Sequence, residues 1–274
     1  MQAYKIVASD LDGTLLVSSS HISRENLDAI HGLAEKGVFF VPATGRTIAE
    51  LPEELLHNPD IRFIIHANGS AILDTKTGER TLMCMPNTLV CEVLSIVNSY
   101  DTYITMRHDG ACIIDAKKHN AADLDRCNVW PLHSELVGAI AQRKEDFAAY
   151  SEAADEVEVF SVFFASDDDR EACRQRLLAT GALMVAEACE HNLEIFSIHA
   201  GKGNALHRLC DMLGIDRAAT ISVGDSDNDA TITKAAGLGL AVANSCGSLK
   251  AIANEVICSN DEHAIAYILA HYFE

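Results

Sequence analysis

Basic residues are scarce in this sequence, and this limits the kinds of molecule that the protein is expected to bind. The 274 residues include 21 Lys and Arg against 40 Asp and Glu, which gives a formal net charge of −19 at pH 7. Proteins bind nucleic acids by displacing phosphate counterions with Lys and Arg, and they dock on anionic membranes through basic patches. The deficit therefore argues against nucleic-acid and membrane partners. It also requires local cations wherever a small anionic substrate binds, because the overall field repels anions.

The sequence also lacks a cysteine framework and a long apolar run. None of the nine cysteines forms a Cys-x-x-Cys pair and their number is odd, which is typical of free thiols in a reducing compartment. No uninterrupted apolar stretch is long enough to cross a bilayer, and no signal-peptide pattern is present. We therefore expect a cytoplasmic protein, and the sequence does not indicate its oligomeric state.

Two carboxylates follow the first apolar run directly. Residues 5–9 form a short run predicted to be a buried strand, and Asp10-Leu11-Asp12-Gly13-Thr14 comes next. Ligands of open parallel sheets bind outside the carboxyl ends of the strands. There, Asp10 could attack a phosphorus atom, and Asp12 could protonate the leaving oxygen and later activate water. An ordinary Asp-rich turn fits this stretch nearly as well, because Asp and Gly dominate turns.

A second polar segment follows the next predicted strand. A helix capped by Ser23 is predicted over residues 23–36, a buried strand over 38–41, and a further helix over 47–57. Between the strand and that helix stands Thr44-Gly45-Arg46. A hydroxyl, backbone N–H groups and the dipole of a following helix can together cradle an anion. Taken alone, Thr44 fits an ordinary turn or cap better, and Arg46 fits a surface position equally well.

The third and fourth polar segments lie near the C-terminal end. Lys202 stands between two glycines at the start of a helix predicted to end near Gly214, where its ammonium could reach a phosphate or offset carboxylates. A strand predicted over 219–223 runs into Gly224-Asp225-Ser226-Asp227-Asn228-Asp229. Asp225 is suited to ligate Mg²⁺, which prefers carboxylate oxygens, and the spacing does not fit a calcium EF-hand. Asn228 could hold a phosphate or Lys202, and Asp229 could order a metal-bound water.

Between the second and third segments the pattern changes. Residues 86–190 contain helix and strand patterns, with a hairpin signal at Asp109-Gly110, but no carboxylate pair or glycine cradle at a strand end. We therefore predict an inserted α+β domain over 86–190 in a core domain of 1–85 and 191–274. A strand over 193–196 is predicted to resume the core, another covers 237–242, and a last helix covers 261–272.

The four segments, in this order, resemble the motifs of the haloacid dehalogenase superfamily. The insert resembles the C2 cap of its Cof-type branch, and four motifs in order are far more specific than one. The resemblance implies an α/β fold with a Rossmann-like parallel sheet and a C2-type cap. It implies a Mg²⁺-dependent phosphatase for a small phosphorylated metabolite, such as a sugar phosphate, nucleotide or cofactor phosphate, with an aspartyl-phosphate intermediate.

The resemblance also implies roles for individual residues. Asp10 would be the nucleophile and Asp12 the general acid and base. The ligands of Mg²⁺ would be Asp10, the backbone carbonyl of Asp12, and Asp225. The phosphate would bind Leu11 through its backbone amide, Thr44, Gly45, Lys202 and Asn228. Supporting roles would fall to Thr14, Arg46, Asp229 and Asn244.

Two alternatives stay open, and the insert adds a further set of candidates. A phosphotransferase or phosphomutase would use the same core with an acceptor hydroxyl in place of water. A phosphometabolite-binding protein without turnover would not need both Asp10 and Asp12. In the insert, Arg107, His108 and Lys117 are candidates to contact a polar substrate, together with Lys118 and His119, although a solvated polar loop fits each of them better.

Overall fold

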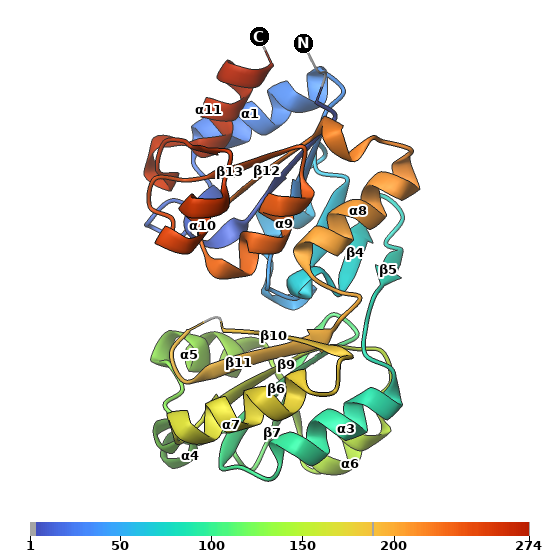
Figure 1. Ribbon diagram of the computed structural model, residues 1–274, viewed down its shortest axis with the longest axis vertical. Coiled ribbons are helices and arrows are strands. Elements are labelled where there is room, and N and C mark those ends of the chain that lie inside the picture. Colours follow the sequence, from blue (N-terminus) through green and yellow to red (C-terminus); the bar gives the residue numbers. More distant parts are fainter. Residues whose placement is uncertain (1–3, 188, 274) are drawn as a thin grey trace. The chain divides into compact units, whose positions relative to one another are not determined.

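The computed structural model describes residues 4–187 and 189–273, and their contacts divide the chain into two compact units (Figure 1). Unit 1 comprises Met1–Gly45, Pro52–Thr81 and Gly201–Glu274. Unit 2 comprises Arg46–Leu51 and Leu82–Ala200. The limits at 81/82 and 200/201 lie four and ten residues from the domain boundaries predicted at 85/86 and 190/191. Unit 2 also takes residues 46–51, which include Arg46 of the second polar segment.

The main sheet of unit 1 is parallel throughout, in the order β14-β13-β12-β1-β2. Its strands are β1 (Ile6–Ser9), β2 (Phe39–Pro42), β12 (Thr220–Gly224), β13 (Leu238–Ala241) and β14 (Glu255–Val256). The chain winds from β1 to β2 in one direction and from β12 to β14 in the other. The order therefore reverses between β1 and β12, and such a reversal opens a crevice at the carboxyl ends of the two strands.

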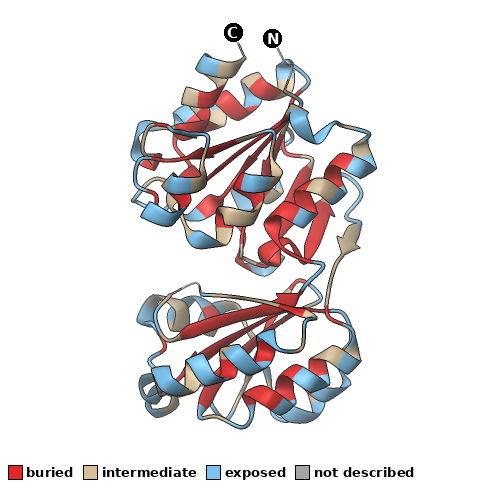
Figure 2. Cartoon of the chain, viewed as in Figure 1, coloured by how far each residue is buried: buried red, intermediate tan, exposed pale blue. Residues whose placement is uncertain are grey.

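Helices cover both faces of this sheet (Figure 1). The helices of unit 1 are α1 (Arg24–Glu35), α2 (Glu53–Leu56), α8 (Lys202–Leu213), α9 (Ala230–Ala235), α10 (Gly247–Ile252) and α11 (Ala264–Tyr272). Helix α1 packs against α11, and α8 packs against α9. In a right-handed crossover, the direction in which the chain moves along the sheet decides which face the connection covers. The β1–β2 and β12–β13 connections run in opposite directions, so they lie on opposite faces. The strands between them are buried, as in Figure 2.

A small sheet extends unit 1 beyond β2. Its strands are β3 (Phe63–His66), β4 (Ala71–Asp74) and β5 (Arg80–Leu82), in that order. Strand β3 pairs antiparallel with β4, and a parallel bridge joins Ala43 to Ile65. The segment after β2 is therefore held from both sides. The short helical turns of unit 1 are η1 (Leu11–Leu15), η3 (Ala67–Gly69), η4 (Arg217–Ala219), η5 (Asp227–Asp229) and η6 (Asn260–Glu262).

Unit 2 is built on a mixed six-stranded sheet in the order β10-β11-β9-β6-β7-β8. Its strands are β6 (Thr102–His108), β7 (Ala111–Asp115), β8 (Gln142–Lys144), β9 (Val157–Phe164), β10 (Leu183–Ala186) and β11 (Asn192–Ser197). Its helical elements are η2 (Ile48–Glu50), α3 (Asn87–Val97), α4 (Ala121–Arg126), α5 (Pro131–Ile140), α6 (Phe147–Ala153) and α7 (Asp167–Leu178).

The two faces of this sheet differ in polarity because alternate side chains point to opposite faces. On one face, Met106, Phe160 and Leu193 pack against apolar side chains of α3, α6 and α7 in one buried cluster. The other face carries smaller apolar clusters and a group of buried polar side chains, which comprises Thr105, Arg107, Ser161 and Glu194.

Most predicted elements are present, and the predicted fold class is confirmed. Ser23 caps α1 by accepting a hydrogen bond from the amide of Asn26 at 3.2 Å. Asp109 and Gly110 both have positive φ in the turn between β6 and β7, as expected for a tight hairpin.

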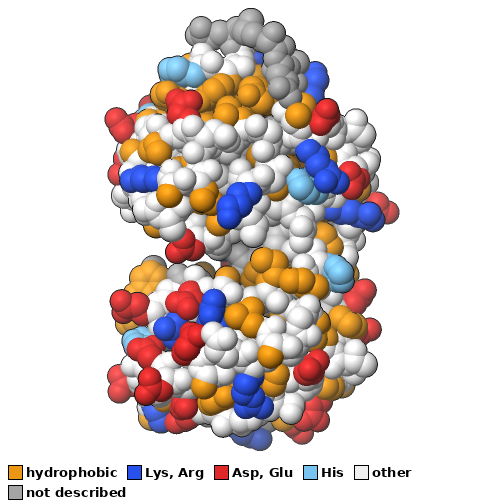
Figure 3. Space-filling model, viewed as in Figure 1, with side chains coloured by type: hydrophobic (Ala, Val, Ile, Leu, Met, Phe, Trp, Pro, Cys, Tyr) orange, Lys and Arg blue, Asp and Glu red, His pale blue; other side chains and the backbone are white. Residues whose placement is uncertain are grey.

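Along the described residues, no helix combines the length and apolar character needed to cross a membrane. Figure 3 shows Lys and Arg scattered among acidic and apolar side chains.

Two predicted elements are wrong. No helix spans residues 47–57, because Pro52 cannot continue a helix and disfavours helical geometry in the residue before it. The segment forms the short turn η2 and the four-residue α2 instead. The strand predicted over 193–196 does not resume the core sheet. As β11, it pairs antiparallel with β9 and β10 in the sheet of unit 2.

Candidate active site

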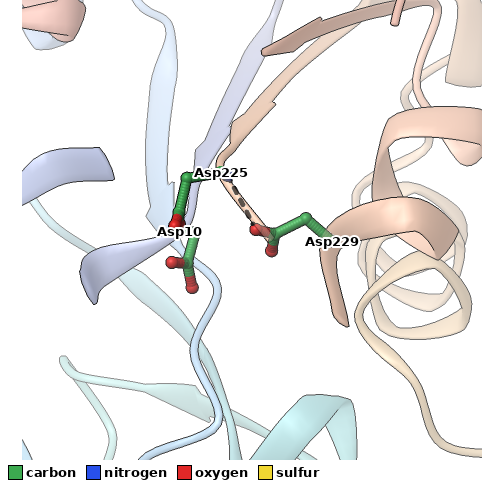
Figure 4. A group of neighbouring side chains, drawn as sticks. All are labelled: Asp10, Asp225 and Asp229. Carbon is green, nitrogen blue, oxygen red and sulfur yellow. Dashed lines mark hydrogen bonds between the residues drawn. The ribbon is translucent and has the colours of Figure 1, made fainter. Parts of the chain in front are cut away.

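The candidate site lies where β1 and β12 end side by side. The two strands pair in register from Ile6 with Thr220 to Ser9 with Val223, so the residues that follow them, Asp10 and Asp225, emerge at the same edge of the sheet. The amide of Asp10 donates to the carbonyl of Val223 at 2.9 Å, which continues the ladder by one residue. The carboxylates of Asp10 and Asp225 lie together in Figure 4.

Lys202 joins two buried carboxylates. Its Nζ lies 2.6 Å from Oδ1 of Asp10 and 2.6 Å from Oδ1 of Asp229, and the three residues are at most 6% exposed. The other oxygen of Asp229 accepts hydrogen bonds from the backbone amides of Asp225 and Ser226 at 3.0 and 3.2 Å. Asp229 therefore both fixes the loop after β12 and neutralises Lys202, whereas the sequence analysis offered Asn228 for contact with that lysine.

The turn after β1 is shaped around Asp225. Thr14 Oγ1 donates to Oδ1 of Asp225 at 3.1 Å. Gly13 has φ of +76°, and a Cβ there would come within 2.7 Å of Oδ2 of Asp225, so this position requires glycine for two reasons. The side-chain amide of Asn244 donates to the carbonyl of Gly13 at 2.8 Å. Thr14 therefore bonds to Asp225 from this turn, and Asn244 bonds to its backbone.

The charges of the cluster do not balance. Burial raises the pKa of Asp10 well above its ordinary value, and Asp229 and Asp225 add to that rise while Lys202 opposes it. Burial also raises the pKa of Asp225, with a further contribution from Asp229. Burial disfavours the charged form of Lys202, but Asp10 and Asp229 outweigh it and raise the pKa of this ammonium. One ammonium among three carboxylates leaves a site that favours an additional cation.

The donor set fits a hard divalent cation. One carboxylate oxygen from each of Asp10, Asp225 and Asp229 can be chosen so that the three lie within 4.8 Å of one another. Carboxylate oxygens are the ligands that Mg²⁺ prefers, and the excess negative charge calls for a cation. The side chain of Asp12 is exposed on the same turn, one residue beyond buried Leu11.

The Thr44 segment lies at the neighbouring strand end. Strand β2 pairs with β1, and the amide of Ala43 donates to the carbonyl of Ser9 at 2.7 Å. The amide of Thr44 donates to Ile65 at 2.9 Å, and its carbonyl accepts from the amide of Asn68 at 3.0 Å. Thr44 is 1% exposed. Its backbone is thus fixed at the edge where Asp10 emerges, although the helix expected after it is missing.

The remaining predicted site residues are placed as follows. Asn228 is half-buried in η5, and its Oδ1 accepts from the hydroxyl of Ser226 at 2.8 Å. Gly45 follows Thr44 in unit 1, where a Cβ would come within 2.9 Å of Oδ1 of Asn68. Arg46 belongs to unit 2 and donates from Nη1 to the carbonyl of Glu50 at 3.1 Å.

The candidates in the insert do not form one group. Arg107 is 5% exposed and ion-paired with Glu50, while Nδ1 of His108 lies 2.9 Å from the hydroxyl of Tyr150. Lys117 is exposed in the turn after β7, as is Lys118, and His119 bonds through Nδ1 to the hydroxyl of Tyr103 at 2.7 Å. Contact of Arg107, His108 or Lys117 with a substrate stays a prediction.

Glu50 is a residue that the sequence analysis missed. It is 6% exposed, and it accepts from the amide of Thr47 at 2.7 Å as the last residue of a capping box. The pattern Thr47-Ile48-Ala49-Glu50 carries the signature of that box, a Thr followed three residues later by Glu. The signature could have marked Glu50 as a fixed carboxylate, but its partner Arg107 is 57 positions away in the sequence.

Comparison with known proteins identifies the family. The sequence profile of the haloacid dehalogenase-like hydrolases matches residues 7–269. The 5-amino-6-(5-phospho-D-ribitylamino)uracil phosphatase YwtE of Bacillus subtilis (strain 168) is 31% identical over 97% of this chain and 96% of its own length. The phosphatase YwpJ of the same strain is 29% identical over 97% and 99%. A solved structure of a haloacid dehalogenase-like hydrolase from B. subtilis has a TM-score of 0.82, with 28% identity over 98% of this chain and 100% of that one.

The chain therefore belongs to the haloacid dehalogenase-like hydrolases, as its resemblance to the Cof-type branch predicted. The expected enzyme class, a phosphoric monoester hydrolase, is confirmed by these relatives.

Proposed function

We propose that the chain is a Mg²⁺-dependent phosphatase that hydrolyses a small phosphorylated metabolite through an aspartyl-phosphate on Asp10. The observation that carries the proposal is the position of Asp10. Its carboxylate lies at the reversal of strand order, 2.6 Å from a buried ammonium and beside Asp225. A carboxylate held in this way is oriented, and its negative charge is stabilised by Lys202.

In the first step, a carboxylate oxygen of Asp10 attacks phosphorus and the bond to the leaving oxygen breaks. Asp12, exposed on the turn beside it, gives its proton to that oxygen. In the second step, the carboxylate of Asp12 takes a proton from water, the water oxygen bonds to phosphorus, and the bond between phosphorus and Asp10 breaks. Inorganic phosphate and the starting carboxylate result. Lys202 neutralises Asp10 and the phosphoryl oxygens during both steps.

The residues that would hold Mg²⁺ are Asp10, Asp225 and the backbone carbonyl of Asp12. When bound, the ion supplies positive charge that offsets the carboxylates and polarises the phosphoryl oxygens. The phosphate would be held by Lys202, by the backbone amide of Leu11, and by Thr44, Gly45 and Asn228. The fixed backbone of Thr44 supports its part in this role.

The substrate class follows from the relatives. YwtE is named for a phosphoester of a polyhydroxylated chain, and its similarity extends over nearly all of this chain. We infer that this chain likewise acts on a phosphate monoester of a small polar metabolite. The acidic net charge is consistent with the absence of a nucleic-acid partner.

A substrate panel tests the proposal. Phosphate release is measured with Mg²⁺ on sugar phosphates, nucleotides, pyridoxal phosphate, flavin mononucleotide and p-nitrophenyl phosphate, using the wild type and Asp10→Asn. We expect turnover of some phosphoesters by the wild type and none by the variant. A parallel series with an alcohol acceptor detects phosphoryl transfer. Binding of phosphoesters without turnover of any would contradict the proposal.

A further inference from the structure

Residues 46–51 belong to unit 2, although the residues on both sides of them belong to unit 1. The chain leaves unit 1 after Gly45 and returns to it at Pro52. We call residues 46–51 the strap. The strap follows Gly45 directly in the sequence. If the proposed function is right, a segment fixed in unit 2 therefore begins at the residue after the phosphate-binding pair Thr44 and Gly45.

The strap is anchored by a buried ion pair. The guanidinium of Arg107 donates to Glu50 through two bonds, Nη2 to Oε1 at 3.2 Å and Nε to Oε2 at 3.3 Å. The two residues are 5% and 6% exposed. Paired bonds of this kind fix direction as well as distance. Nη1 of Arg107 is also buried, and it has no hydrogen-bond partner among the described residues. It therefore makes no bond that could substitute for the two bonds to Glu50.

Further bonds tie the strap to the sheet of unit 2. The hydroxyl of Thr47 donates to Oε2 of Glu158 at 3.2 Å, and the amide of Ala49 donates to the carbonyl of Gly110 at 3.2 Å. Oε1 of Glu158 in turn accepts from the amide of Gly110 at 3.0 Å. The strap therefore contacts β9, β6 and the turn between β6 and β7.

Both members of the pair are held in their charged forms. Burial disfavours a charged Glu50, but Arg107 and the amide of Thr47 outweigh it and lower the pKa of Glu50. Burial likewise disfavours the charge on Arg107, whereas Glu50 and Glu194 together raise its pKa. Loss of either charge would leave the other buried without its closest partner, which is strongly unfavourable.

We propose that Glu50 and Arg107 are positioning residues for phosphate binding, because they fix the strap and thereby hold Thr44 where its hydroxyl binds the phosphate. Thr44 is held on one side by its bonds to Ile65 and Asn68. Gly45, where a Cβ would come within 2.9 Å of Oδ1 of Asn68, is the only residue between Thr44 and the strap. A displacement of Arg46 or Thr47 therefore reaches Thr44 through a single tightly packed residue.

The first test removes the charge and keeps the shape. Glu50→Gln should raise the KM for p-nitrophenyl phosphate and the inhibition constant of inorganic phosphate about threefold to tenfold, with a smaller change in kcat. Arg107→Lys keeps the charge but loses the paired bonds, and it should act in the same direction. The control is Glu187→Gln, which breaks the 2.7 Å pair with Arg170 elsewhere in unit 2 and should leave both constants unchanged.

The decisive test is a double variant that combines Glu50→Gln with Thr44→Ala. If Glu50→Gln does not fold, Arg107→Lys takes its place in the double variant. If the pair acts through Thr44, the double variant binds inorganic phosphate no more weakly than Thr44→Ala alone. Losses that multiply would show that Glu50 acts elsewhere and would overturn the inference. If Thr44→Ala loses phosphate affinity but Glu50→Gln does not, the role inferred for Glu50 and Arg107 is overturned, while the proposed role of Thr44 stands. No effect of Thr44→Ala would overturn the proposed role of Thr44 as well.

Discussion

The ammonium of Lys202 lies 2.6 Å from Oδ1 of Asp10, although the two residues are 192 positions apart in the sequence. One is the first residue after β1, and the other is the first residue of α8. The same ammonium holds Asp229 at the same distance. Lys202 is therefore the cation that makes a buried pair of carboxylates tolerable at the edge of the sheet.

Replacement of this lysine should cost both stability and activity. Lys202→Met leaves two buried carboxylates without their partner, and removal of one member of a buried ion pair costs about 3 kcal/mol or more. We expect a loss of that size in the free energy of unfolding, measured with urea, and a fall of about 10²-fold in kcat. The exposed Lys234, changed to Met in the same way, serves as the control. Wild-type stability in Lys202→Met would contradict this account of the pair.

The role of Asp12 is tested by the leaving group. A positioned general acid contributes about 10²–10⁴-fold. Asp12→Asn should slow hydrolysis of a sugar phosphate by such a factor and affect p-nitrophenyl phosphate much less, because p-nitrophenolate leaves without a proton. The two kcat/KM values are compared with those of the wild type. Equal losses on both substrates would mean that Asp12 only shapes the turn.

Removal of the metal should abolish activity without unfolding the protein. EDTA is expected to stop phosphate release and Mg²⁺ to restore it, while Ca²⁺ inhibits because its larger, looser coordination disturbs in-line geometry. Binding to the folded state should also raise Tm with Mg²⁺ concentration. Asp225→Asn should weaken that rise. Full activity after exhaustive chelation, or the same Mg²⁺ dependence of Tm in Asp225→Asn, would exclude this metal site.

A buried histidine gives a prediction on pH. His66 is 0% exposed, neither ring nitrogen has a partner among the described residues, and burial, with Arg80 nearby, lowers its pKa to about 3. Between pH 6.5 and 3 the unfolded chain binds a proton that the folded chain does not, so stability falls as pH falls. This group alone should cost about 2 kcal/mol between pH 7 and 5. His66→Leu should remove that part of the slope in urea titrations, and an unchanged slope would contradict the assignment.

The strand ends of the site could be predicted from the sequence because their signals are local. Asp10 and Asp225 each follow a short apolar run, and residues after parallel strands meet at one edge of a sheet. Gly13 and Thr14 stand in the tight turn where glycine and a hydroxyl were expected.

What could not be predicted depends on distant pairing. The apolar strand pattern of residues 193–196 would suit the sheet of either unit. Only the pairing of this strand with β9 assigns it to unit 2. Asp229, rather than its neighbour Asn228, contacts Lys202 because the tight turn η5 directs the Asp229 carboxylate back toward the strand end. The missing helix is different, since Pro52 was visible in the sequence and argued against it.

The central claim, covalent catalysis by Asp10, is tested most directly by trapping the intermediate. Wild type with Mg²⁺ and p-nitrophenyl phosphate labelled in its phosphate is quenched in acid during turnover and digested, and the labelled peptide is sequenced. The account predicts label on Asp10 within the first turnover, accumulation of that label in Asp12→Asn, and no label in Asp10→Asn. Steady turnover with no label on Asp10 at any quench time, or undiminished activity in Asp10→Asn, would contradict it.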